Sequence, residues 1–140
     1  MKTVRTLLST LIALSLSSCS DSPSASQART QLENKIQQQS NGLIRLVSFD
    51  KTDGKTMEFG GMKGYEMMYT AEIEFLDDCL WSENTLMMEG IFSAVRGQAP
   101  ASGSPQEYLN ASDGMKPVKK GDHFKFTGRM NFEKTESGWH

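Results

Sequence analysis

The feature of the sequence that most constrains the fold is a strict alternation of apolar and polar residues between positions 65 and 75. The odd positions are apolar and the even ones polar apart from one methionine: Tyr65, Met67, Tyr69, Ala71, Ile73 and Phe75 alternate with Glu66, Met68, Thr70, Glu72 and Glu74. Successive side chains of a β-strand point to opposite faces. The pattern therefore predicts a strand with one buried face and one in water, on which Met68 is an exposed apolar residue. Its length of about 36 Å is roughly twice that of a usual strand, so we expect it to bend.

An amphipathic helix is predicted before this strand, over residues 28–40. The segment contains neither Gly nor Pro, and its apolar residues recur at every fourth position: Ala28, Leu32 and Ile36. This spacing is typical of a helix with a narrow apolar stripe. Asn41 and Gly42 follow as a left-handed stop.

Further strands are predicted on both sides of the alternating segment. Residues 43–51 read as a strand that ends at Asp53-Gly54, a pair that favours a tight hairpin turn. We predict another strand over residues 85–95 and a loop over residues 97–106. A last long strand has an apolar inner face that includes a glycine, where the sheet can bend or the helix can approach closely: Phe124, Phe126, Gly128, Met130 and Phe132. The pattern leaves open whether a final strand forms after Gly138.

One helix followed by antiparallel strands, without βαβ alternation, predicts an α+β domain. We expect the helix to pack on the concave face of a curved sheet of four or more strands. The element order, and the ending Phe132 to Trp139 with its Lys-Thr-Glu-Ser-Gly-Trp close, resemble uncharacterised envelope lipoproteins with cystatin-like or nuclear-transport-factor-like cone folds. The chain departs from that pattern because only two residues follow Gly138.

The first residues form a signal peptide by composition. Lys2 and Arg5 precede an uncharged apolar run, and the segment is too short and too rich in serine for a transmembrane helix, which needs about 20 apolar residues. The run ends in Leu16-Ser17-Ser18-Cys19, which resembles the bacterial lipobox. The resemblance implies that residues 1–18 are removed and that Cys19 is acylated. An ordinary secretory peptide with an incidental cysteine is the alternative.

An acylated Cys19 predicts a cell-envelope protein anchored to a membrane through several acyl chains. By the sorting preference of lipoproteins, Ser20 favours the outer membrane, facing the periplasm, while Asp21 leaves the inner membrane open. Residues 19–27 then comprise the lipidated cysteine and a flexible tether, small, polar and proline-containing. Residues 28–140 form a single α+β domain.

Charge and cysteine content narrow the range of partners. Without residues 1–18 the chain has 13 basic and 17 acidic residues, a formal charge of −4, so nucleic acid is not an expected partner. With Cys19 acylated, Cys79 is the one remaining thiol and no disulfide within the chain can form. Its neighbours Asp77 and Asp78 disfavour a thiolate, which indicates a buried structural cysteine.

Residues suited to catalysis or metal binding are sparse. His123 and His140 have no second ligand at metal spacing, and His123 reads as a solvent-facing strand residue. We therefore predict no catalytic residues, no metal site and no cofactor. The first hypothesis is a non-enzymatic module that binds an envelope protein through its curved sheet or an exposed edge strand.

The alternative hypothesis is a carrier of a small apolar ligand, held between the helix and the sheet. Tyr65, Met67 and Tyr69 are its candidate binding residues, because tyrosine combines an apolar ring with a polar hydroxyl and methionine adapts to irregular surfaces. Plain core packing is the competing interpretation of the same three side chains.

Overall fold

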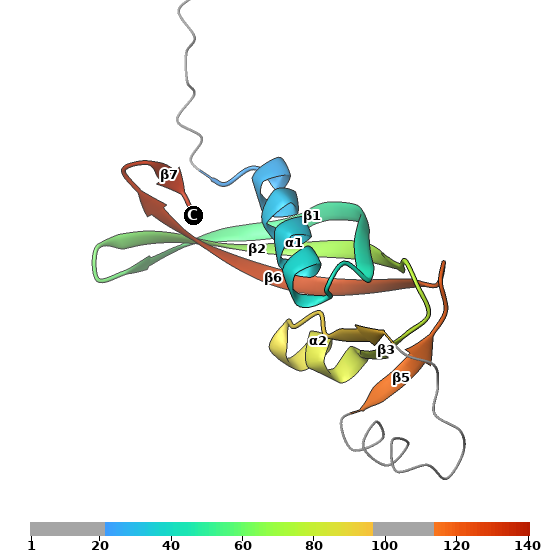
Figure 1. Ribbon diagram of the computed structural model, residues 1–140. Helices are drawn as coiled ribbons and strands as arrows, with labels where there is room; N and C mark the ends of the chain where they lie inside the picture. Colours follow the sequence, from blue (N-terminus) through green and yellow to red (C-terminus); the bar gives the residue numbers. More distant parts are fainter. Residues whose placement is uncertain (1–21, 97–113) are drawn as a thin grey trace, which may run out of the picture.

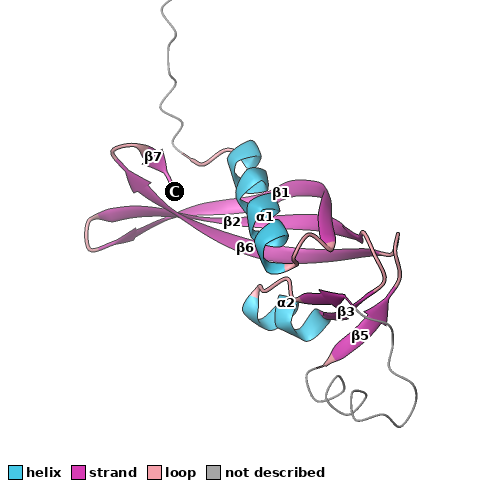
Figure 2. Cartoon of the chain, in the orientation of Figure 1, coloured by secondary structure: helices cyan, strands magenta, loops and turns pink. Residues whose placement is uncertain are grey.

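The computed structural model describes residues 22–96 and 114–140. It confirms the predicted α+β class: helix α1 packs on a strongly curled antiparallel sheet (Figures 1 and 2). That sheet has the strand order β1-β2-β6-β7, and a smaller sheet has the order β4-β3-β5. The elements in chain order are α1 (Ala25–Gln39), β1 (Ile44–Phe59), β2 (Met62–Phe75), β3 (Cys79–Ser82), α2 (Glu83–Glu89), β4 (Ala94–Arg96), β5 (Met115–Val118), β6 (His123–Thr135) and β7 (Gly138–Trp139).

Helix α1 starts three residues earlier than the sequence pattern indicates. The Ser24 side chain caps it by accepting a hydrogen bond from the Gln27 amide at 3.1 Å. Residues 25–27, expected in the tether, are therefore helical, because the cap lies at Ser24. The predicted apolar stripe is buried in full, and the left-handed stop is confirmed by positive φ angles of 51° at Asn41 and 73° at Gly42.

The predicted hairpin turn at Asp53-Gly54 is wrong. Strand β1 continues through both residues, and the chain reverses at Gly60-Gly61, whose φ angles are 57° and 85°. Gly54 instead leaves room for the Tyr65 side chain: a Cβ atom at this position would lie 2.1 Å from the Tyr65 hydroxyl oxygen. A bulge between Lys51 and Asp53 shifts the register of β1 against β2 just before this contact.

Strands β2 and β6 form the centre of the main sheet, as the alternation predicts. Every odd-numbered residue from Tyr65 to Phe75 is buried, and Met68 on the opposite face is 42% exposed. β6 pairs with β2 over eleven residues, which places Gly128 opposite Tyr69. Because Gly128 has no side chain, the Tyr69 ring packs directly over its backbone. The group that approaches this glycine closely is therefore a ring from the neighbouring strand β2.

The predicted strand over residues 85–95 is wrong for most of its length. Residues 83–89 form α2, and only Ala94–Arg96 pairs as β4. The local reason is capping at both ends. The Ser82 hydroxyl accepts from the Thr85 amide at 3.2 Å, and Gly90 ends the helix with a φ of 64°.

The end of the chain forms a minimal last strand. Gly138 and Trp139 pair with Thr135 and Lys134, and Trp139 is buried. The predicted signal peptide, Cys19 and the predicted loop over residues 97–106 lie outside the described residues. In the part of the chain that is described, neither helix is long and apolar enough to cross a membrane.

Candidate binding surfaces

The three predicted ligand-binding residues share the inner face of β2 but belong to two apolar clusters. Tyr65 and Met67 pack with Ala28, Phe132 and Trp139. Tyr69 belongs to the larger cluster beneath the second half of α1. The structure therefore places the three side chains in a row within the core, and ligand binding by them stays a prediction.

Tyr65 is held by contacts within the chain. Its hydroxyl oxygen accepts a hydrogen bond from Lys51 Nζ at 2.8 Å, and the same ammonium group lies 4.8 Å from the ring centroid. The ring packs edge-on against Trp139, with 6.0 Å between ring centroids. These contacts tie the start of β2 to Lys51 on β1 and to Trp139 on β7.

Tyr69 lines a cavity of about 320 Å³ between α2 and β6. Leu86, Phe92 and Phe126 give it apolar walls, and Lys35 and Arg129 also line it. The Tyr69 ring stacks on Phe49 at a centroid distance of 4.9 Å. Burial raises the pKa of Tyr69, so its hydroxyl stays neutral. The lining is more polar than apolar and includes two cations, which suits a small amphiphile with an acidic group.

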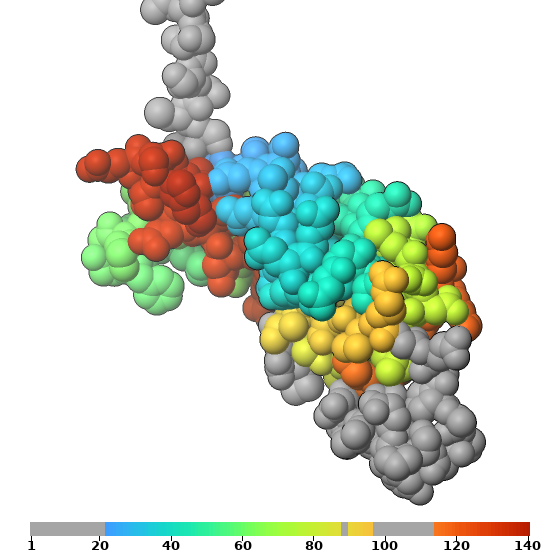
Figure 3. Space-filling view, viewed as in Figure 1, coloured from blue at the N-terminus to red at the C-terminus, as the bar shows by residue number. Residues whose placement is uncertain are grey.

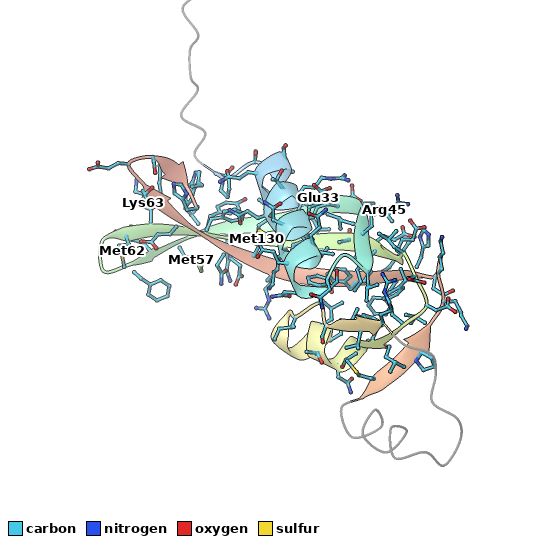
Figure 4. All side chains as sticks on the ribbon, viewed as in Figure 1. Glu33, Arg45, Met57, Met62, Lys63 and Met130 are labelled. Carbon is cyan, nitrogen blue, oxygen red and sulfur yellow. The ribbon has the colours of Figure 1, made fainter. Side chains whose placement is uncertain are left out.

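A second hollow lies between α1 and the edge strand β1. Its volume is about 600 Å³, and Ile36, Ile44 and Leu46 form its apolar part. Glu33 on α1 and Arg45 on β1 also line it; Figure 4 labels both where the helix passes over this strand. Arg45 is bound to Glu74 on β2, and Glu33 to Arg29 on α1. We call this hollow the α1–β1 groove.

The third surface is the tip of the β1–β2 hairpin, which extends past the part of the sheet that α1 covers (Figures 1 and 3). Phe59 is 73% exposed and its cross-strand partner Met62 is 58% exposed. Met57 pairs with Gly64, so its side chain shares a face with these two, and a Cβ on Gly64 would lie 3.8 Å from Met57 Cβ. We call Met57, Phe59 and Met62 the tip cluster.

Cys79 and Trp81 lie in the core, on β3. The prediction of a buried cysteine is confirmed. Burial raises the pKa of the Cys79 thiol, and the adjacent carboxylates of Asp77 and Asp78 raise it further. Trp81 packs edge-on against its aromatic neighbours, and its indole Nε1 has no hydrogen-bond acceptor among the described residues.

His123 lies on the outer face of the sheet, as predicted. Its Nδ1 is 2.7 Å from Glu72 Oε1. The hydrogen bond with His123, aided by Lys125, lowers the pKa of Glu72. Sequence reasoning missed this pair because its two members are 51 positions apart. Within residues 22–96 and 114–140, no three side chains of His, Cys, Asp or Glu come together in a group that could hold a metal ion.

Comparison with known proteins adds no further information about the site. The chain matches no family model, no curated protein and no solved structure.

Proposed function

We propose that this chain is a lipid-anchored cell-envelope protein that acts without catalysis and binds a partner protein at the free edge of β1 and the α1–β1 groove. The anchoring part rests on the basic and apolar start of the sequence and on Leu16-Ser17-Ser18-Cys19. The binding part rests on one observation: among the described residues, the longest strand is an edge strand with a groove of mixed polar and apolar lining beside it.

An edge strand offers unpaired backbone N–H and C=O groups to another extended chain. In the described part of the chain, β1 is hydrogen-bonded to β2 on one side only. A partner segment that adds to this edge would have every second side chain directed toward the groove. Leu76, which lines the groove and is 38% exposed, would meet an apolar side chain there, while Glu33 and Arg45 would favour a partner with complementary charges.

Two bulges limit what can pair with β1. The register shifts between Leu46 and Ser48 and again between Lys51 and Asp53. Bulges twist an edge and discourage unlimited sheet extension. The regular stretch Ile44–Leu46 lies beside the groove, so the edge suits a short segment with matching side chains better than a second long strand.

Site-specific photo-cross-linking tests the binding site. Gln37 lines the groove, whereas its neighbour Gln38 is also exposed and points about 100° away around the helix. A photoreactive amino acid at Gln37 is expected to capture one envelope protein in stoichiometric yield, and the same group at Gln38 is not. The captured protein, once purified, should bind the wild-type chain more tightly than a Glu33→Lys, Arg45→Glu variant. Equal capture at both positions, or equal affinity of the variant, would contradict the proposal.

The anchor has a separate test. Cys19→Ser should abolish labelling with radioactive fatty acid and release the protein from membranes. Continued attachment of this variant to the membrane would show that Cys19 is not the anchor.

The cavity beside Tyr69 favours a second candidate function, a carrier of a small acidic amphiphile. Native mass spectrometry of the protein extracted in mild detergent would then show an added small mass. The mass should disappear in a Lys35→Glu, Arg129→Glu variant. A bare chain, or a mass unaffected by these changes, would argue against the carrier.

A further inference from the structure

The tip cluster lies beyond the cover of the core. Strand β1 is buried beneath α1 at Ile44 and Leu46, but from Lys51 onward all its residues are half-buried or exposed. Phe59 and Met62 flank the Gly60-Gly61 turn and are among the most exposed large apolar side chains of the described residues. A pair of this kind at the end of a protruding hairpin calls for a partner, because exposed apolar groups at a projecting point are costly in water.

The tip lies at the end of the molecule where the described chain begins. At the start of α1, the Gln27 side chain donates a hydrogen bond to the Trp139 carbonyl, and Ala28 packs with Tyr65. Met62 precedes Tyr65 by three strand residues, a distance of about 10 Å. Figure 1 shows the described chain starting above this half of the sheet, with the β1–β2 hairpin extending past it.

The predicted lipid attachment lies close to the same end. Cys19 precedes Ser22 by three residues, and three residues span at most about 11 Å. An acylated Cys19 would thus hold the start of α1 near the bilayer surface, and the hairpin tip would lie near that surface too.

We infer that the tip cluster inserts into the surface of the lipid bilayer that holds the protein, as a second and noncovalent membrane contact. This inference rests on the proposed lipid anchor. Phe59 and Met62 enter the boundary between headgroups and acyl chains, while Lys63, on the opposite face of the hairpin, reaches the headgroups with its long side chain (Figure 4).

Apolar insertion, and not attraction to anionic lipid, is the source of this contact. The charges around the tip are mixed: Lys63 and Lys134 are accompanied by Glu58, Glu133 and Glu136. Two apolar side chains alone would bind a bilayer weakly. The anchor compensates for this, because it keeps the tip at high effective concentration beside the bilayer. The lipid anchor and the tip cluster together would fix the orientation of the domain. The α1–β1 groove would then have a defined position relative to the membrane.

Depth measurements with a fluorescent probe test the inference. The full lipidated protein is reconstituted in phosphatidylethanolamine and phosphatidylglycerol vesicles, with the dye NBD attached to Met62→Cys. The matched control carries NBD at Met87→Cys on α2, where the native methionine is 54% exposed, similar to Met62. The buried Cys79 does not compete for the label.

We expect the probe at position 62 to show blue-shifted emission and quenching by nitroxide-labelled lipid, and the probe at position 87 to show neither. Phe59→Ser should reduce the quenching at position 62, because it removes the most exposed apolar side chain of the tip cluster. Equal quenching at the two positions, or none at position 62, overturns the inference. A blue shift at position 62 that grows with protein density without nitroxide quenching also overturns it, in favour of contact between copies of the chain.

Vesicle flotation distinguishes a failure of the tip inference from a failure of the proposed lipid anchor. If the lipidated protein floats with the vesicles while the probe at position 62 stays in water, the anchor holds and the tip inference is wrong. If the protein does not float, the anchor itself is wrong.

Discussion

Gly128→Ala tests whether the centre of the sheet is built around a missing side chain. An added Cβ would lie 2.4 Å from both Cζ and the hydroxyl oxygen of Tyr69, whereas carbon atoms in good contact are about 3.5–4.0 Å apart. The Tyr69 ring would have to move by about 1 Å or more. It cannot do so freely, because it stacks on Phe49 and meets Phe126 edge-on, at a centroid distance of 6.2 Å.

The expected loss of stability follows from two opposing effects. Overpacking a core typically costs about 1–3 kcal/mol. Replacing glycine by alanine within a strand returns about 0.5–1 kcal/mol. Gly128→Ala should therefore lower the free energy of unfolding by about 1–2 kcal/mol.

Gly64→Ala is the matched control, because Gly64 lies in β2 of the same sheet. Its added Cβ would meet its nearest neighbours at 3.5 Å or more, which is ordinary contact. This variant should be as stable as the wild type or more stable by up to about 1 kcal/mol. Equilibrium urea unfolding of the mature chain without lipid, followed by tryptophan fluorescence, measures both. If Gly128→Ala is no less stable than Gly64→Ala, Tyr69 does not depend on the glycine and the reasoning is refuted.

Three further predictions concern buried and paired groups. Cys79 should resist iodoacetamide in the native protein and react fully in urea, since burial and its two neighbouring aspartates raise the pKa of the thiol; rapid native alkylation would disprove this. Trp81→Phe should cost less than about 1 kcal/mol because it removes an unpaired buried donor, whereas Trp81→Ala should cost about 3–5 kcal/mol; equal losses in urea unfolding would contradict the packing. His123→Ala should raise the pKa of Glu72 in an NMR titration. Because the folded pKa is lowered, the stability that the pair contributes is present above the ordinary glutamate pKa and is lost as the pH falls through the lowered value; an unchanged Glu72 titration would show that the pair does not form.

The central strands could be predicted from the sequence because burial there follows a simple period. Each odd residue of β2 from Tyr65 onward faces the core, and β6 repeats the pattern. The stripe of α1 is predictable for the same reason. A curved α+β sheet follows from these elements, because a strand of this length with one buried face has to curl around the helix that covers it.

The hairpin turn and α2 could not be predicted because local signals compete there. Asp53-Gly54 and Gly60-Gly61 both favour a tight turn, and the choice depends on Tyr65, whose ring needs the space above Gly54. Residues 85–95 contain enough apolar side chains for a strand, yet the cap at Ser82 and the left-handed Gly90 lie at helical spacing. Tyr65 and the Ser82 cap both lie outside the segments whose patterns predict strands.

The candidate surfaces are harder to predict from the sequence than the core is. The sequence predicts partner binding through the curved sheet or an exposed edge strand, but the identity of that edge as β1 depends on the strand order, which places β6 on the other side of β2. The tip cluster depends on the turn at Gly60-Gly61, because this turn places Phe59 and Met62 opposite each other at the end of a hairpin. The error at Asp53-Gly54 therefore concealed a surface as well as a turn. Since the tip contributes little to the core, its exposed apolar pair is better explained by a contact outside the chain than by folding.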